Sequence, residues 1–457
     1  MTRFAHTLIV VVSSILLGLS LNMAFAAAKA HADISDEEEP ITRTRVEQIM
    51  PDHPRPPELV PVDPLPRIGV RDGEGEWQEW RVFYNTKTGE QFHPEGYNHT
   101  ILGMGNWHAT FNVGQYDPEA MEDTLSHMAE LGSNIIRLWA WGENVEGEGV
   151  TGLSDSHGLN AEYMSNFIDF LQRATRHGVY VIAIFDRVPT NAYYDSIVES
   201  ADNNEFTSIT GVNRQYLAPG LIAAKGALAA DFIRYIKEAD EGLLNTVFSW
   251  QLANESNIHS AQGPFMYREG HIMTANGKTY DMSDKDSRQA CWDDGIVHWT
   301  NELTAAIKEV DPNTFVNVGF WTADAHGREP YNGLLDPEPD PRIPPRPSVL
   351  VDDNCSVDFI SASIYPWGDE PIVRPEAHEW EAVKASGIPT LVQEYGARKR
   401  ETLETAADHV IALRDQFYAM GYQGSLFWSW NLEQPGTYNA HHGNLMEVSA
   451  PKNSILR

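Results

Sequence analysis

Residues 247–256 read VFSWQLANES, an apolar run that ends in the pair Asn254-Glu255. A short apolar run of this kind is typical of a strand buried on both faces, as in a parallel sheet. Similar runs predict further strands at residues 91–98, 134–140, 179–185, 315–320, 358–365, 389–393 and 424–430. The strand at 246–252 is therefore the fourth in a series of eight.

Amphipathic helical patterns separate most of these runs, at residues 118–131, 160–177, 221–239, 293–309 and 401–420. Strands that alternate with helices indicate βαβ units, and this number of them predicts a single α/β catalytic domain, a (β/α)8 TIM barrel. The Pro-rich segment 321–355 is predicted to lack a helix. Active-site residues of such barrels lie at the carboxyl ends of the strands, so Glu255 is expected at the mouth of the barrel.

The first 66 residues have a different composition. Residues 1–30 combine a basic start, an apolar stretch and small residues, which predicts a secretory signal peptide; the alternative is an uncleaved membrane anchor. Residues 31–66 are acidic and then Pro-rich, with seven prolines in the sixteen residues 51–66, and predict a disordered or extended arm. The barrel domain is expected at 67–457, secreted or periplasmic, with no membrane contact after signal removal.

Charge and cysteine content restrict the possible partners. The net charge of −32 excludes nucleic acid as a partner and favours neutral or cationic ligands over anionic glycans. The two cysteines, Cys291 and Cys355, are too few for a disulfide framework, and whether they pair stays open. The oligomeric state stays open as well.

A second carboxylate follows the pattern of the first. Glu394 ends the seventh strand in IPTLVQEYGA, as Glu255 ends the fourth. Two carboxylates at the mouth of one barrel suit cleavage of a glycosidic bond, in which one protonates the leaving oxygen and the other attacks the sugar or activates water. Arg137 lies inside the apolar stretch IIRLWA, where a cation needs a buried partner.

These motifs together resemble the clan of barrel-shaped retaining β-glycosidases, and within it glycoside hydrolase family 5. The resemblance covers residues 91–431. It rests on Gly96-Tyr97-Asn98 in the first strand, Gly132-Ser133-Asn134-Ile135-Ile136-Arg137 entering the second, Trp250-Gln251-Leu252-Ala253-Asn254-Glu255 in the fourth, Tyr365 in the sixth, Gln393-Glu394-Tyr395-Gly396 in the seventh and Phe427-Trp428 in the eighth.

The resemblance implies a role for each matching residue. Glu255 is expected to be the general acid/base, with a pKa raised by burial and by the nearby Glu394. Glu394 is expected to be the nucleophile, kept ionised by Arg137 and the Tyr365 hydroxyl. Asn254 is expected to hydrogen-bond the sugar 2-hydroxyl. The implied chemistry needs no metal and no cofactor.

Two positions depart from the family pattern, and several aromatic residues accompany the motifs. Where the family often has histidine, this chain has Phe185-Asp186 after the third strand and Ser363 before Tyr365. Asp186 and Ser363 are expected to supply different hydrogen bonds, and Asp186, Glu143 and the pair His441-His442 are candidate sugar contacts. Candidate sugar-stacking platforms are Trp139, Trp141, Trp321, Trp367, Trp428 and Trp430, with Trp428 beneath the reacting sugar by resemblance.

The expected activity is a secreted retaining glycoside hydrolase acting by double displacement on a β-linked neutral poly- or oligosaccharide. RLWAW and WQLANE resemble the β-mannanase branch of the family, so β-1,4-mannan is the first expected substrate and β-1,4-glucan the second. An exo-acting β-glycosidase or a transglycosylase would use the same residues. A non-catalytic carbohydrate-binding surface protein is the alternative from another class.

Overall fold

The computed structural model describes residues 59, 61–102, 108–141, 147–156, 158–202, 204–321, 341–365 and 377–455. All of them belong to one compact unit, His53–Arg457. The predicted signal peptide at 1–30 and most of the predicted arm at 31–66 lie outside the described residues.

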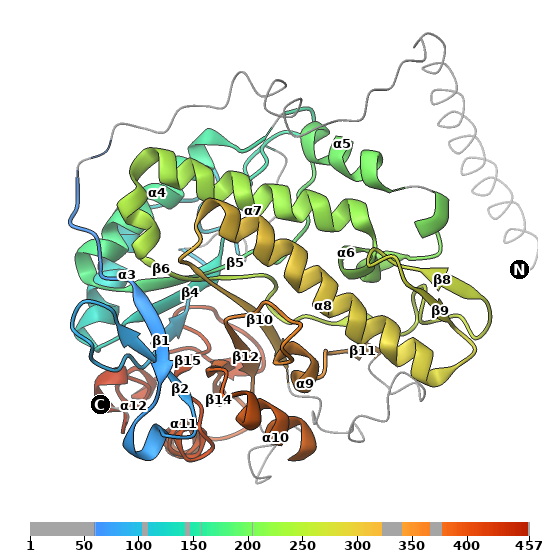
Figure 1. Ribbon diagram of the computed structural model, residues 1–457. Coiled ribbons are helices and arrows are strands. Elements are labelled where there is room, and N and C mark those ends of the chain that lie inside the picture. The colour runs from blue at the N-terminus through green and yellow to red at the C-terminus, as the bar shows by residue number, and fades with distance from the viewer. Residues whose placement is uncertain are drawn as a thin grey trace, which may run out of the picture. The chain divides into compact units, whose positions relative to one another are not determined.

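Eight parallel strands form a closed barrel in the described part of the chain, which confirms the predicted fold (Figure 1). Neighbours follow the order of the sequence, and the last strand pairs with the first. The strands are β3 (Glu95–Asn98), β4 (Ile135–Trp139), β5 (Tyr180–Ile184), β6 (Val247–Gln251), β10 (Phe315–Trp321), β12 (Phe359–Ser363), β13 (Thr390–Tyr395) and β15 (Ser425–Phe427).

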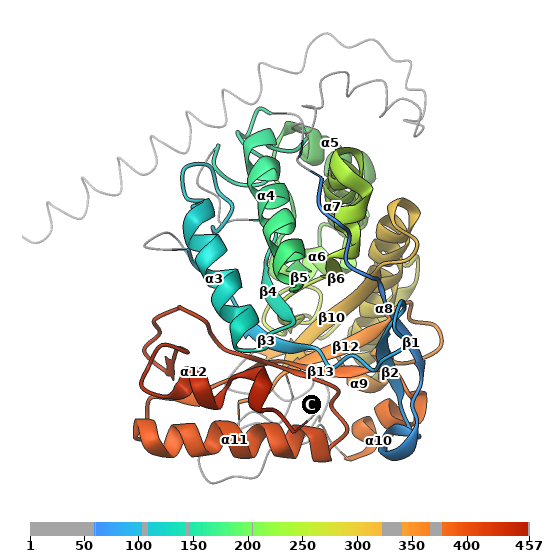
Figure 2. The ribbon, with the colours of Figure 1, turned by 90° about the vertical axis from the view of Figure 1, so that its left-hand side faces the viewer.

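Helices connect these strands on the outside of the barrel. The long ones are α3 (Pro118–Glu130), α4 (Ala161–His177), α7 (Pro219–Asp240), α8 (Lys285–Val310) and α11 (Leu403–Ala419), each matching a predicted helix. The shorter ones are α5 (Ala192–Ala201), α6 (Arg214–Leu217), α9 (Pro347–Leu350), α10 (Ala377–Ser386) and α12 (Leu445–Val448). The helices α3, α4, α7 and α8 follow one another around the barrel wall (Figure 2).

Local sequence signals explain where the helices begin and end. The Asp117 side chain caps α3 by accepting from the backbone N–H groups of Glu119 and Ala120, and Pro118 takes the first helical position. Gly178 ends α4 with a left-handed φ of 69°. Asp284 caps α8 in the same way as Asp117 caps α3, which starts that helix eight residues before the predicted position 293.

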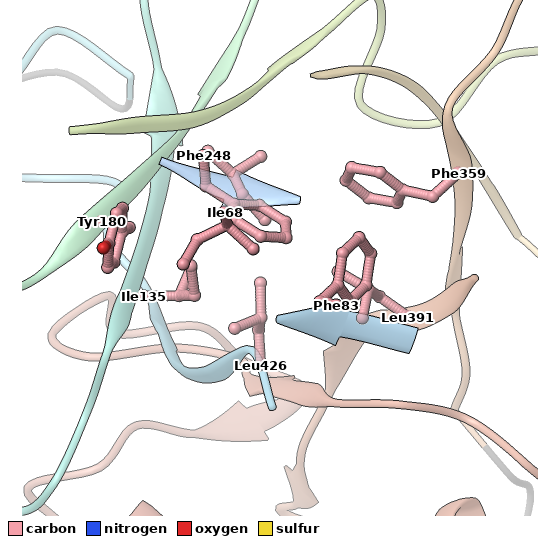
Figure 3. Close-up of a cluster of buried hydrophobic side chains, with 9 residues drawn as sticks. Ile68, Phe83, Ile135, Tyr180, Phe248, Phe359, Leu391 and Leu426 are labelled. Carbon is pink, nitrogen blue, oxygen red and sulfur yellow. The ribbon is translucent and has the colours of Figure 1, made fainter. Parts of the chain in front are cut away.

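A two-stranded hairpin closes the amino-terminal end of the barrel. Its strands are β1 (Ile68–Asp72) and β2 (Arg81–Asn85), paired antiparallel. Phe83 of this hairpin is fully buried among side chains from the starts of the barrel strands, including Phe248 and Phe359, with ring centroids 5.1 and 5.4 Å away (Figure 3). The barrel is therefore a filled core at this end, with aromatic rings as its base.

The residues just before the hairpin are tied to the same end. Tyr180 Oη donates to the carbonyl of Pro66 at 2.6 Å, and Arg67 forms an ion pair of 2.9 Å with Asp311. The described end of the predicted arm thus packs against the barrel domain.

Loops at the carboxyl ends of the strands are joined by short antiparallel pairs. The pair β7 (Ile258–His259) with β11 (Arg342–Ile343) joins the loops after β6 and β10, and β14 (Ala397–Arg398) with β16 (Thr437–Tyr438) joins those after β13 and β15. The hairpin of β8 (His271–Met273) and β9 (Thr279–Asp281) turns at Gly277, which has a φ of 75°. The first two of these pairs tie together loops that follow different barrel strands.

The sequence left open whether the two cysteines form a disulfide. Cys291 and Cys355 are both buried free thiols, so the two cysteines do not pair in a disulfide. Among the described residues, no single helix is long and apolar enough to cross a membrane. The helices Gly211–Leu217 and Pro219–Asn245, which are bent by 70° relative to each other, reach the required length and apolar composition only when they are taken together.

Candidate active site

Two carboxyl groups lie at the carboxyl end of the barrel, on strands that are not neighbours. Glu394 lies in β13 and is 4% exposed, and Glu255 follows β6 and is partly buried. The negative charge of Glu255 raises the pKa of Glu394, so the two groups are within electrostatic range. The barrel brings together the two glutamates that the sequence singled out.

Arg137 on β4 is completely buried beside Glu394, and its guanidinium donates to four different side chains. Nη1 donates to Glu394 Oε1 at 3.0 Å and to Asn98 Oδ1 at 2.6 Å, Nε to Gln251 Oε1 at 2.8 Å, and Nη2 to Asn254 Oδ1 at 2.5 Å. A buried cation with several acceptors and a carboxylate partner avoids much of the cost of leaving water. The expectation of a buried partner for Arg137 is confirmed.

The second oxygen of Glu394 also receives a hydrogen bond. Tyr365 Oη donates to Glu394 Oε2 at 3.1 Å. Burial and the charge of Glu255 raise the pKa of Glu394 to about 7, although Arg137 and Tyr365 act in the opposite direction. Burial also raises the pKa of Glu255. The pair is thus built to hold one proton near neutral pH.

The two departures from the family pattern both support the segment that carries Glu255. Asp186 Oδ1, after β5, accepts from the backbone N–H of Asn254 at 2.9 Å. Ser363, at the end of β12, accepts from Gln393 Nε2 at 3.0 Å, and the same nitrogen donates to the backbone carbonyl of Asn254 at 2.7 Å.

The sequence of this chain is similar to the sequences of two known proteins. It is 22% identical over 379 residues to mannan endo-1,4-β-mannosidase A of Hypocrea jecorina, an alignment that covers 76% of this chain and 69% of that protein. It is 22% identical over 371 residues to mannan endo-1,4-β-mannosidase of Mytilus edulis, covering 72% and 84%.

The comparisons indicate a glycoside hydrolase. Its fold is the closed (β/α)8 barrel described above. Among solved structures, the β-1,4-D-mannanase of Cryptopygus antarcticus is similar over 84% of this chain and 94% of that chain, with 16% identity and a TM-score of 0.49. No family model matches the chain.

The aromatic rings of Trp139 and Trp428 lie beside Arg137 in the hydrolase. The guanidinium carbon of Arg137 lies 5.5 Å from the centre of the Trp139 ring, and the rings of Trp139 and Trp428 meet edge to face at 5.9 Å. His108 packs against Trp139, with ring centroids 3.8 Å apart. Trp139 and Trp428 are therefore brought to the site as expected.

The other predicted aromatic platforms lie in different surroundings. Trp141 and Trp321 each have an arginine over the ring, Arg187 at 5.1 Å and Arg342 at 5.2 Å. The charge of Arg342 lowers the pKa of Glu255, so this arginine reaches the same site from β11. Trp367 lies outside the described residues, as does Glu143.

Trp430 and the histidine pair belong to a packing cluster. Trp430 is 4% exposed and packs against Tyr97 at 5.0 Å and His441 at 4.9 Å between ring centroids. His442 lies 3.4 Å from Glu433, an exposed carboxylate. None of these contacts involves Glu255, Glu394 or Arg137, so the described contacts of this cluster are structural.

Sequence reasoning missed two amides and one histidine of the site. Gln251 and Gln393 lie directly beneath the carboxylates and bond to each other, with Gln251 Nε2 donating to Gln393 Oε1 at 2.7 Å. Both interrupt apolar strands, and a polar side chain in a doubly buried strand needs a partner, which is the signal that could have found them. His108 lies outside the predicted strands and had no such signal.

The described residues of the hydrolase contain no group of three or more His, Cys, Asp or Glu side chains placed to hold a metal ion.

Proposed function

We propose that the protein is a secreted retaining β-glycoside hydrolase that cleaves β-1,4-mannan, with Glu255 as general acid/base and Glu394 as nucleophile. The observation that carries the proposal is the different environment of the two carboxyl groups. Both oxygens of Glu394 receive hydrogen bonds, from Arg137 at 3.0 Å and from Tyr365 at 3.1 Å. Such donors favour the ionised form, so the shared proton of the pair belongs on Glu255.

In the first step, Glu394 attacks the anomeric carbon while Glu255 gives its proton to the glycosidic oxygen. The bond from that carbon to the leaving sugar breaks, and a covalent bond to a Glu394 oxygen forms. Arg137 and Tyr365 hold the attacking carboxylate in position before the step, which lowers its entropic cost. In the second step, Glu255 takes a proton from water, and that water displaces Glu394 from the sugar.

The neighbouring residues fit substrate binding near this pair. Asn254 uses Oδ1 to accept from Arg137, so its Nδ2 group is the end available to donate to a sugar hydroxyl. Trp428 and Trp139 offer aromatic surface for the apolar C–H face of a sugar ring. Asp186 acts through the backbone of Asn254. The two related proteins that are named as mannan endo-1,4-β-mannosidases support mannan as the first substrate to test.

The domain boundaries are part of the proposal. Residues 1–30 act as a signal peptide, 31–66 as an arm, and 67–457 as the catalytic barrel. Secretion follows from the basic start and the apolar stretch of the first thirty residues.

A reducing-end assay of the mature protein on mannan, cellulosic β-glucan, xylan and galactan tests the activity, with Glu394→Gln as the control. Turnover on mannan that the substitution abolishes is the expected result. Proton NMR of the first product should give the β-anomer, since two displacements retain the configuration. Activity that survives Glu394→Gln would exclude Glu394 as nucleophile. Binding without turnover on all four glycans would support a carbohydrate-binding protein instead.

A further inference from the structure

The strand β13, which carries Glu394, has one residue more than either of its neighbours matches. Toward β15, the three steps from 392 to 395 along β13 match the two steps from 425 to 427. Toward β12, the two steps from 392 to 394 match the one step from 362 to 363. The extra residue common to both pairings is Gln393, which makes it a β-bulge directly before Glu394.

The bulge explains why two consecutive side chains of β13 both enter the barrel. Successive side chains of a regular strand point to opposite faces, so a strand that turns Gln393 inward would turn Glu394 outward. Here Gln393 bonds to Gln251 across the barrel at 2.7 Å, and Glu394 bonds to Arg137 at 3.0 Å. The next residue, Tyr395, packs outward against the helix α11. The position of Glu394 in the site therefore depends on the bulge.

The side chain of Asn98, on β3, bonds to the backbone at this bulge. Asn98 is completely buried, and its Nδ2 donates to the carbonyl of Gln393 at 2.8 Å. The same nitrogen donates to the carbonyls of Leu426 at 3.4 Å and Phe427 at 3.3 Å, both on β15. A bulge disrupts the ladder around its extra residue, and a side-chain donor can replace a bond that the ladder lacks there. The amide of Asn98 thus bridges β13 and β15 where their register shifts.

The other end of the same amide is bonded to Arg137. Asn98 Oδ1 accepts from Arg137 Nη1 at 2.6 Å, and Nη1 also donates to Glu394 Oε1 at 3.0 Å. The amide cannot be reversed, because backbone carbonyls only accept and a guanidinium only donates. Asn98 therefore contacts both the backbone that carries Glu394 and the cation that binds its carboxylate.

The backbone of Asn98 is itself held from both sides. It lies opposite Arg137 in the pairing of β3 with β4. Its carbonyl accepts from the backbone N–H of Trp430 at 2.8 Å, which ties it to the chain after β15. A side chain on so fixed a backbone can hold its partners in one position.

We propose that Asn98 is the positioning residue of the nucleophile, a role that rests on the function proposed above: its amide holds the bulge at Gln393 and aims Arg137 at Glu394, so that the carboxylate faces the anomeric carbon before attack. Asn98 exchanges no proton and takes no part in the bonds that form and break. Its contribution is the geometry of the attacking group.

The barrel offers a matched control in Asn317, on β10. Like Asn98, it is completely buried, and its amide both donates and accepts: Nδ2 donates to Ser361 Oγ at 2.9 Å, and Oδ1 accepts from Ser249 Oγ at 3.0 Å. Neither of these bonds involves the backbone of β13 or a charged group. Asn98→Ala and Asn317→Ala therefore remove the same buried amide with and without loss of the contacts at the nucleophile.

The test compares kcat and KM of the wild type, Asn98→Ala and Asn317→Ala on a manno-oligosaccharide and on a dinitrophenyl β-mannobioside, whose leaving group needs no proton. In Asn98→Ala, kcat should fall about 100-fold on both substrates, the cost of misplacing a reacting group by about 1 Å. Its KM should stay within about twofold of the wild type, because the substrate contacts are unchanged. Asn317→Ala should lose stability but keep kcat within about threefold, because the carboxylates keep their partners.

Asn98→Asp decides the case if Asn98→Ala does not fold. It keeps the volume and the acceptor for Arg137 but turns an acceptor toward the carbonyl of Gln393, so kcat should fall at least about tenfold. A kcat within about twofold of the wild type in the Asn98 variant that folds, a change in KM alone, or an equal fall of kcat in Asn317→Ala would overturn the proposal.

A second readout needs no turnover: crystal structures of the wild type and the Asn98 and Asn317 variants. In the Asn98 variant, Glu394 Oε1 should move by about 1 Å or more from its place beside Arg137, and in Asn317→Ala it should stay. An unmoved Glu394 in the Asn98 variant would contradict the proposed role. If the wild type cleaves no glycan, the proposed function fails, while this comparison still decides whether Asn98 positions Glu394.

Discussion

The two ends of the barrel interior are made from the same strands but from opposite kinds of residue. At the amino-terminal end, Phe359 of β12 packs with Phe83 and Phe248 in an aromatic base. Further along the same strand, Ser361 and Ser363 bond to Gln393 in a polar layer. The comparison teaches that one strand can supply stability with its first inward residue and chemistry with the next two, because side chains on one face recur every second position.

The cost of a change should differ between the two ends. In the base, removed atoms leave a cavity and weaken folding, and the carboxylates are not touched. In the polar layer, removed atoms leave donors or acceptors unpaired and also move the charges around Glu394. Substitutions at each end therefore separate the two contributions.

The largest effect is expected at the polar end for Arg137→Met. Four acceptors lose their donor and Glu394 loses its cation. We expect kcat/KM to fall by about 10³-fold and the free energy of unfolding by about 3 to 5 kcal/mol. Kinetics and urea denaturation measure the two quantities, with Arg137→Lys expected to keep part of each because it keeps the charge. Full activity in Arg137→Met would remove the basis for treating the polar layer as catalytic support.

A substitution at the aromatic end should lower the free energy of unfolding and leave the activity nearly unchanged. Phe83→Ala removes a ring that is fully buried between Phe248 and Phe359, and should lower the free energy of unfolding by about 3 to 5 kcal/mol. The kcat of the folded fraction should stay within about twofold of the wild type, because the change lies at the far end of the barrel from the carboxylates. Phe83→Leu is the smaller matched change. A collapse of kcat without loss of stability would contradict the division between the two ends.

The smallest effect is expected in the pH dependence of the free energy of unfolding. Burial and the charge of Glu255 raise the pKa of Glu394 to about 7, and burial raises the pKa of Glu255, so the folded pair binds its shared proton more tightly than the same two groups of the unfolded chain do. The resulting stability is complete below the unfolded pKa and is lost as pH rises through the folded pKa. Glu394→Gln removes one of the two coupled carboxyl groups, so the variant should escape a loss of about 3 kcal/mol.

The difference in unfolding free energy, variant minus wild type, should therefore rise between about pH 5 and about pH 8. Urea denaturation at the two pH values measures it. A difference that stays flat across this range would mean that the folded protein does not raise the pKa of Glu394.

Much of the architecture was accessible from local patterns. Each of the eight strands of the barrel falls within or beside a predicted apolar run, because strands buried on both faces are apolar along their length. The short helices α5, α6, α9, α10 and α12 were not predicted, and α9 lies in the segment 321–355 that was expected to lack a helix. The helix α8 starts earlier than expected, at Lys285, because its cap at Asp284 lies beyond the apolar stretch. Caps and short helices depend on a few polar residues that resemble loop sequence.

Only some residues of the candidate site could be predicted from the sequence. Glu255 and Glu394 stand out because a carboxylate ends an apolar run, and Arg137 because a charge interrupts one. Gln251, Gln393 and Ser363 give a weaker signal, since each is an uncharged residue in a strand. His108, which packs against Trp139, lies outside every predicted strand and helix, so no periodicity pointed to it.

The sequence by itself determined the alternation of strands and helices, the positions of the two glutamates at strand ends, and the need for a partner to Arg137. These follow from hydrophobic periodicity and from the cost of burying charge, which act on each segment alone. Only the tertiary structure decided that Arg137, Gln251, Gln393 and Ser363 form one chain of hydrogen bonds, and in which direction its protons point. That order depends on closing the barrel, because only closure brings side chains from four different strands within bonding distance of one another.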